Sequence, residues 1–182
     1  MASSNKILII GNLLRIGGAE KLIYEIVCFA RANAIQPEIL ILDNYEKEHY
    51  DEVYARMGVR VTRTRLDNIK HFRAPLKMLR SLIWLIKLKF FSGSGYASVH
   101  VIGLYNVYRV IGKLKHPKRF FWNVNNAIQF PDRKYPYPAE YFANTDDTIV
   151  CINRFQLIEM NEQYGAVALK AKLSLFKLFI AE

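Results

Sequence analysis

The fold is decided by the stretch Lys6-Ile7-Leu8-Ile9-Ile10-Gly11-Asn12-Leu13-Leu14-Arg15-Ile16-Gly17-Gly18-Ala19-Glu20. Its first part is a short apolar run that ends at a glycine, which predicts a strand buried on both faces of a sheet. A helix is expected from Ala19 to Ala30, because its apolar residues form one continuous stripe: Leu22, Ile23, Ile26, Val27 and Ala30. The stretch therefore predicts a strand, a glycine-bearing loop and an amphipathic helix.

Gly17 and Gly18 stand directly before this helix. Glycine lets the backbone approach a ligand closely, and the first free N–H groups of a helix favour an anion. The spacing matches neither the dinucleotide pattern G-x-G-x-x-G nor the phosphate-loop pattern G-x-x-x-x-G-K-[ST]. Two interpretations stay open: an anion site, and a tight connection in which the glycines serve only the turn.

Length and composition predict one globular domain over residues 1–182, since 52% of the residues are hydrophobic. Cys28 and Cys151 lie in apolar segments, which favours free thiols over a disulfide. The first residues carry no pattern of a secretory signal. We therefore expect a cytoplasmic protein.

The net charge of +10 is concentrated between residues 60 and 89, which hold nine basic residues and one acidic residue. Such a density of positive charge attracts the phosphates of nucleic acid, anionic lipid or sugar diphosphates, and charge alone does not choose among them. A helix is expected from Leu76 to Phe91, with an apolar run too short to span a bilayer. It is either a core-facing helix with a basic rim or a helix that lies on a membrane surface. The candidate membrane or anion contacts are Arg73, Lys77, Arg80, Trp84 and Lys87.

Strand and helix patterns alternate along the rest of the chain. Further strands are expected at 37–42, 59–64, 96–102, 118–124 and 148–152, and helices at 45–57, 105–114 and 154–164. Residues 129–141 indicate a long surface loop, and residues 170–182 a final strand or helix. The alternation predicts an α/β fold: a Rossmann-like, doubly wound, mainly parallel sheet of six to seven strands in three layers.

Ligands of such sheets bind beyond the carboxyl ends of the strands. This rule brings together the Gly11–Gly18 loop, the residues after Ile102 and the pair Asn125-Asn126. Amide side chains orient hydroxyls and sugars well, although an asparagine cluster also suits a turn. His100 is either a ligand contact or a hydrogen-bonded structural residue. No histidine has metal-ligand spacing, so we expect no metal site, and no G-x-S-x-G elbow appears.

The order of these features resembles the N-terminal domain of the GT-B glycosyltransferases, in particular the large retaining family that uses nucleotide sugars. The match runs through Lys6–Ile10, Gly17-Gly18-Ala19-Glu20, Gly58-Val59, Val99-His100 and Gln163-Tyr164-Gly165. The resemblance implies one half of a GT-B fold, with Gly17 and Gly18 against the diphosphate of a nucleotide-diphosphate sugar and no other cofactor. It makes His100, Tyr105 and Asn123 the acceptor-binding candidates.

Asn125 and Asn126 stand where that family often carries a histidine close to the reacting sugar, so they are the catalytic candidates. Asn153 stands where the family has a serine at the start of the sixth helix. The resemblance also implies a second, nucleotide-sugar-binding domain that residues 1–182 do not include. We therefore expect this chain to be a fragment or one half of a two-chain enzyme, inactive alone.

The expected acceptor is a cell-surface polysaccharide, a glycan or a lipid-linked group, reached from the inner face of the cell membrane. We expect no nucleic-acid partner, and we expect the chain to self-associate. The alternative is a non-catalytic subunit that binds the acceptor or recruits a transferase to the membrane. A nicotinamide-dependent oxidoreductase is a weaker alternative, because the three-glycine fingerprint is absent and no acidic residue except Asp43 stands at the tip of the second strand.

Overall fold

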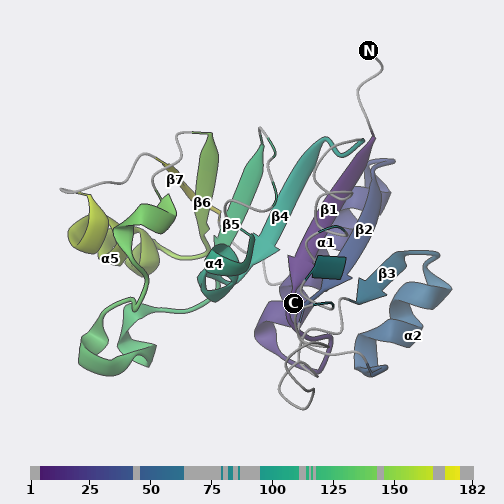
Figure 1. The fold of residues 1–182 in the computed structure, drawn as a ribbon, viewed down its shortest axis with the longest axis horizontal. Coiled ribbons are helices and arrows are strands. Elements are labelled where there is room, and N and C mark those ends of the chain that lie inside the picture. Colours follow the sequence, from purple (N-terminus) through teal and green to yellow (C-terminus); the bar gives the residue numbers. More distant parts are fainter. Residues whose placement is uncertain are drawn as a thin grey trace.

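The computed structural model describes residues 5–42, 46–63, 95–110, 118–142, 146–165 and 171–176, together with residues 79, 82, 83, 86, 114 and 116. Its strands are β1 (Lys6–Gly11), β2 (Gln36–Ile41), β3 (Arg60–Arg63), β4 (Ser98–Ile102), β5 (Arg119–Asn123), β6 (Asp147–Cys151) and β7 (Lys172–Leu175). They form one seven-stranded sheet in the order β3-β2-β1-β4-β5-β6-β7, and every pair is parallel (Figure 1). The predicted doubly wound parallel sheet is confirmed.

The helices of the described residues are α1 (Gly18–Ala32), α2 (His49–Arg56), α4 (Val107–Val110) and α5 (Arg154–Tyr164). Short 3₁₀ turns follow the strands at η2 (Leu104–Asn106), η3 (Ala127–Gln129), η4 (Pro131–Arg133) and η5 (Ala139–Phe142). All these connections run between parallel strands, so the carboxyl ends of the strands meet at one edge of the sheet.

The sheet is buried on both faces, as the apolar strands predict. Successive side chains of a strand point to opposite faces, so Ile9 packs with Val27 of α1 and Leu8 packs in the cluster that contains Met160 of α5. One cluster contains residues of α1 and α2, and the other contains residues of α4 and α5. The result is the expected three-layer arrangement of helix, sheet and helix.

α1 covers its face of the sheet with the predicted stripe. Leu22, Ile23, Val27 and Ala30 are buried, and Ile26 is half-buried. α2 was expected to begin at Tyr45 and instead begins at His49. The carboxylate of Asp51 accepts a hydrogen bond from the backbone N–H of Glu48 at 2.7 Å, which fixes the first turn there.

Three further predictions are settled by the described residues. Gly58 has φ of 67°, the left-handed conformation expected after α2. The final segment forms a strand, β7, rather than a helix, although residues 177–182 lie outside the described residues. The loop over residues 129–141 is not wholly on the surface, because Tyr135 is only 3% exposed and its ring packs 5.9 Å from that of Phe130.

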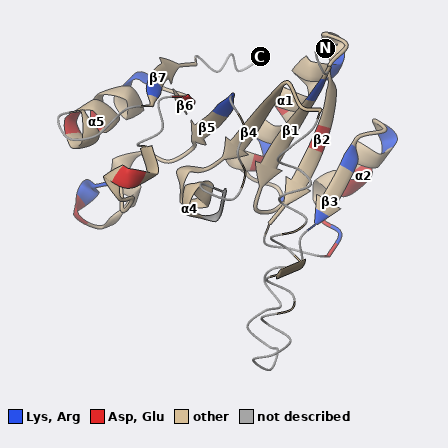
Figure 2. Cartoon of the chain, turned by 45° about the horizontal axis from the view of Figure 1, so that its top comes forward, with Lys and Arg blue, Asp and Glu red and all other residues tan. Residues whose placement is uncertain are grey.

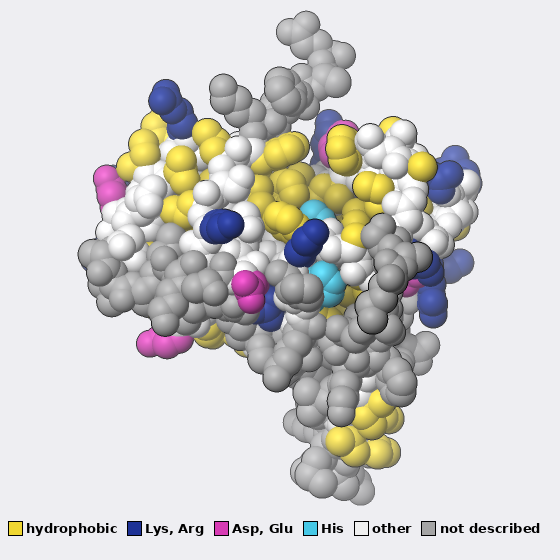
Figure 3. Space-filling model, turned by 90° about the horizontal axis from the view of Figure 1, so that it is seen from above, with side chains coloured by type: hydrophobic (Ala, Val, Ile, Leu, Met, Phe, Trp, Pro, Cys, Tyr) yellow, Lys and Arg dark blue, Asp and Glu magenta, His cyan; other side chains and the backbone are white. Residues whose placement is uncertain are grey.

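The basic window is described only in part. Arg73, Lys77, Arg80, Trp84 and Lys87 lie outside the described residues. Leu79, Leu82, Ile83 and Ile86 are helical, but between 44% and 54% of each is exposed. The core-facing interpretation is therefore wrong for these four residues. Figure 3 shows hydrophobic side chains across the upper half of the view and a separate group at its lower end.

Charged side chains of the described part are dispersed over several helices and strand ends (Figure 2). Arg63 of the basic window forms ion pairs within the protein. Its Nη1 lies 3.5 Å from Glu48 Oε2, and the guanidinium also pairs with Asp51. Cys28 and Cys151 are free thiols, as expected, and burial raises the pKa of Cys151 to about 12. None of the helices in the described ranges is both long and apolar enough to cross a membrane.

Candidate functional site

A pocket of about 460 Å³ opens at the carboxyl edge of the sheet. It lies where the strand order reverses between β1 and β4, the place where doubly wound sheets bind their ligands. Its described lining consists of Gly18, Ala19, Glu20, Leu22, Tyr105, Val124, Asn125 and Ile152. Four separate connections supply these residues, so the pocket exists only in the folded chain.

One wall is the start of α1. Gly17 is the residue before its first turn, in an extended conformation with φ of −174°, and no side chain caps the helix there. A Cβ at Gly18 would meet no heavy atom within 4 Å, so the backbone at this position faces open space. The first N–H groups of a fifteen-residue helix thus border the pocket, as the sequence predicts.

The loop before this wall is held by a residue that the sequence did not reveal. Glu48, before α2, accepts the backbone N–H of Leu14 at 2.6 Å and Nε of Arg15 at 2.9 Å. Leu14 itself is fully buried between the helices and the sheet. A carboxylate 34 residues away carries no local signal in the sequence, so only the fold identifies it as the anchor.

Tyr105 enters the pocket from the connection after β4. Gly103 has φ of 87°, a conformation that side chains rarely adopt, and a Cβ there would collide with the Tyr105 ring. Glycine at position 103 therefore permits both the turn and the close approach of the ring. The structure confirms that Tyr105 and Gly18 border the same pocket.

The opposite wall is the turn after β5, and it separates the three predicted asparagines. Asn125 lines the pocket, with its Nδ2 donating to Gln129 Oε1 at 3.0 Å. Asn123 is 1% exposed, and its Nδ2 donates to the hydroxyl of Tyr135 at 2.9 Å. Asn126 accepts a hydrogen bond from Asn153 Nδ2 at 3.1 Å. The described contacts of Asn123 and Asn126 are thus with the protein itself.

Polar side chains of α5 hold the turn after β5 in place through hydrogen bonds. Gln156 is 1% exposed; its Nε2 donates to the Asn125 carbonyl at 3.2 Å and its Oε1 accepts the Ile152 N–H at 2.8 Å. Glu159 Oε2 accepts both the Tyr135 hydroxyl at 2.8 Å and the Ala127 N–H at 3.0 Å. Burial raises the pKa of the Tyr135 phenol, which keeps it neutral and able to donate.

His100 lies in the middle of β4 and not among the residues that line the pocket. Its ring stacks on Phe120 with centroids 4.9 Å apart, and Trp122 Nε1 donates to its Nδ1 at 3.2 Å. Burial lowers the pKa of His100 from 6.5 to about 4, so the imidazole is neutral at physiological pH. These contacts agree with the structural alternative for His100.

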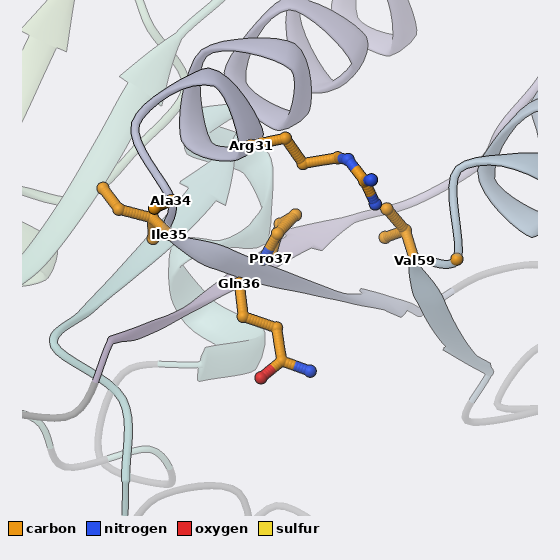
Figure 4. Close-up of a pocket in the computed structure, with 7 residues that line it drawn as sticks. Arg31, Ala34, Ile35, Gln36, Pro37 and Val59 are labelled. Carbon is orange, nitrogen blue, oxygen red and sulfur yellow. The ribbon is translucent and has the colours of Figure 1, made fainter.

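A second, smaller hollow of about 230 Å³ lies at the other end of the sheet, where α1 ends and β2 begins. Figure 4 shows Arg31 reaching across it from α1 toward Val59. Nη1 of Arg31 donates to the Met57 carbonyl, so this arginine ties α1 to the end of α2. The guanidinium thus has a structural partner, and we place the candidate site at the carboxyl edge.

The described residues contain no group of three His, Cys, Asp or Glu side chains that could hold a metal ion. A comparison with protein-family models gave no match, and a comparison with curated proteins gave none either. The function proposed below therefore rests on the pocket and on the residues that line it.

Proposed function

We propose that this chain is the acceptor-side domain of a GT-B-type glycosyltransferase, which moves a sugar from a nucleotide-diphosphate sugar to a polysaccharide or glycolipid acceptor. The observation that supports the proposal most is the pocket between the start of α1 and the Asn125 turn. It combines backbone N–H groups, a carboxylate, a tyrosine and an amide with four aliphatic side chains. Its volume of about 460 Å³ is in the range of small-molecule sites.

In this proposal, the backbone at Gly17 and Gly18 approaches the diphosphate of the donor. Helix N-termini favour anions because their N–H groups are unsatisfied and the helix dipole is positive there. Asn125 and Tyr105 face the same space and contact the transferred sugar or the acceptor hydroxyls. His100, Asn123 and Asn126 act through the shape of the sheet and the turn.

Exposed apolar residues around the pocket support a second half that closes it. Ile16 in the loop before α1 is 79% exposed, Ile128 after Asn125 is 63% exposed, and Phe155 in the first turn of α5 is 71% exposed. All three follow the carboxyl ends of strands, so they lie toward the same edge of the sheet. Large exposed apolar side chains on the same side of a sheet as a pocket suit a surface that another domain covers. We propose the nucleotide-binding half, in the same or another chain, as that domain.

The ligand class is tested by calorimetric titration with UDP-glucose, GDP-mannose, NAD and NADP. We expect binding of a nucleotide sugar and its loss in Gly18→Leu, because the new side chain projects into open space in the pocket without a clash in the protein. Lys21→Leu, an exposed change on the same helix, is the control and keeps binding. Binding of a nicotinamide cofactor alone would replace the proposal by an oxidoreductase.

Catalysis is tested separately, because a site between two halves needs both. We expect no sugar transfer by this chain alone and transfer after it is joined to a nucleotide-sugar-binding half. Transfer by residues 1–182 alone would contradict the two-half proposal.

A second candidate function, a subunit that recruits a transferase to the membrane, is supported by the exposed residues Leu79, Leu82, Ile83 and Ile86. An apolar helical face in a basic segment suits an anionic lipid surface. Flotation with vesicles of phosphatidylglycerol and phosphatidylcholine tests it. We expect binding to the anionic vesicles and at least a tenfold loss when all four residues are changed to Ser. Equal flotation of the variant would show that these four residues do not bind the membrane, and failure of the unchanged chain to float with either lipid would remove the membrane from both candidates.

A further inference from the structure

Glu20 is the one charged side chain among the described residues that line the pocket. It folds back over the start of α1, so that a Cβ at Gly17 would collide with its Oε2. None of the described residues gives Glu20 an ion pair or a hydrogen bond to its carboxylate. Among the described residues, the Glu20 carboxylate therefore stands without an ion-pair partner beside the backbone that approaches the donor.

The size of the pocket puts every ligand within reach of this charge. A cavity of about 460 Å³ is roughly 10 Å across, which is close to one Debye length at physiological salt. Protein on several sides lowers the effective dielectric constant, so repulsion by the Glu20 carboxylate weakens the binding of a ligand by about threefold to tenfold for each negative charge that the ligand carries. Ligands of equal shape and different charge are therefore bound unequally.

Sugar transfer itself changes the charge of the ligand. The bond between the anomeric carbon and the β-phosphate oxygen breaks with its electron pair on that oxygen. The acceptor hydroxyl oxygen forms the new bond to the anomeric carbon and releases its proton to solvent. The β-phosphate, a diester in the donor, becomes a terminal phosphate whose second ionisation has a pKa near 6, so the product carries about one more negative charge at pH 7.

We propose that Glu20 is a specificity-determining residue that makes the pocket favour the nucleotide sugar over the free nucleoside diphosphate. The inference rests on the proposed function, because it assumes that the diphosphate lies in this pocket. The carboxylate weakens binding of both ligands, and it weakens binding of the product more. Glu20 thus reduces occupation of the site by spent nucleotide.

The test is calorimetric titration of the chain with UDP and UDP-glucose, and with GDP and GDP-mannose, at low salt. Glu20→Gln keeps the size of the side chain and removes its charge. The matched control is Glu25→Gln, an exposed change on the same helix outside the pocket lining. Glu20→Ala is the second variant, and thermal unfolding verifies that each variant is folded.

We expect Glu20→Gln and Glu20→Ala to tighten binding of the nucleoside diphosphate and to shift its Kd relative to that of the nucleotide sugar by about threefold to tenfold. The shift shrinks at 0.5 M salt, and Glu25→Gln leaves the ratio unchanged. If both ligands bind and the ratio stays the same in the Glu20 variants, the role of Glu20 is refuted and the proposed function stands. If no nucleotide or nucleotide sugar binds any variant, both fall together.

Discussion

Two helices, α1 and α5, begin at the carboxyl edge of the sheet, and their first turns are completed in different ways. At α5, Asn153 Oδ1 accepts the Gln156 N–H at 2.9 Å, while its Nδ2 holds Asn126 at 3.1 Å. At α1, Gly17 has no side chain, and no cap is formed. The start of α5 is thus consumed in holding the asparagine turn, whereas the start of α1 is left to face the pocket.

The unsatisfied N–H groups at the start of α1 are therefore available to a ligand, whereas those of α5 are partly used by its cap. Capping the N-terminus of a helix typically contributes about 1 kcal/mol, and α1 forgoes it. The same helix start carries Glu20 in the pocket wall. The start of α5 therefore supports the site, and the start of α1 supplies groups that a ligand can contact. Substitutions at the two helix starts should have different effects.

The largest expected effect comes from the polar support beneath the asparagine turn. Gln156→Leu leaves the Asn125 carbonyl and the Ile152 N–H without their buried partner, so we expect a loss of about 3 kcal/mol in the free energy of unfolding. Urea denaturation measures it. Gln129→Leu, in the same turn but exposed, should cost less than about 1 kcal/mol. Equal losses would contradict a supporting role for α5.

His100 is a predicted site residue that lies at neither helix start, and it should affect stability through its protonation. Its pKa is about 4 in the folded chain and 6.5 ordinarily, so the unfolded chain binds more protons between these values. Stability should therefore fall as pH drops through 6.5 and level off below about 4. We expect a loss of about 2 kcal/mol between pH 7.5 and pH 5. His100→Leu should remove this part of the pH dependence in denaturant titrations at each pH.

The cap of α5 is tested by Asn153→Ala, which removes the bond to the Gln156 N–H. We expect a loss of about 1 kcal/mol, measured by thermal denaturation, and near-complete recovery in Asn153→Ser, which can cap the helix again. Because the same side chain holds Asn126, the Asn126 resonances in amide spectra should shift in the alanine variant. A variant as stable as the wild type would show that the two helix starts do not differ in this respect.

The smallest stability effect is expected at the start of α1, where Gly17→Ser supplies the missing cap. Position 17 is extended, so serine is tolerated, although its Cβ displaces the flexible end of Glu20. We expect a gain of about 0.5 kcal/mol together with weaker nucleotide-sugar binding, because the hydroxyl takes an N–H group that the ligand would use. Stabilisation without any change in binding would separate the α1 start from the site.

The sequence predicts much of this fold because its strands are strong local patterns. Lys6–Ile10 is apolar throughout and becomes a central strand, while Val59–Thr64 alternates and supplies the edge strand β3. The parallel order then follows from alternation of strands and helices. The sequence also predicts part of the pocket. Gly18, Tyr105 and Asn125 all come after strand ends, and the carboxyl ends of parallel strands meet at one edge of the sheet.

The remaining site residues depend on details that a local pattern does not contain. Asn123 ends β5 on the face opposite to Val124, so the alternation of the strand buries its side chain instead of turning it into the pocket. His100 is in mid-strand and is enclosed by Phe120 and Trp122 of the neighbouring strand. Glu48 and Gln156 support the walls through contacts that only the tertiary fold creates.

The most direct test of the central claim is a titration of isotope-labelled protein with UDP-glucose and GDP-mannose, observed by amide NMR. We predict shifts of the backbone signals of Gly17–Glu20 and of the Asn125 side-chain amide, with little change at Arg31 and Gly58 around the opposite hollow. Shifts confined to that opposite end of the sheet, or none with either nucleotide sugar, would contradict the claim that the α1 start and the Asn125 turn contact the donor.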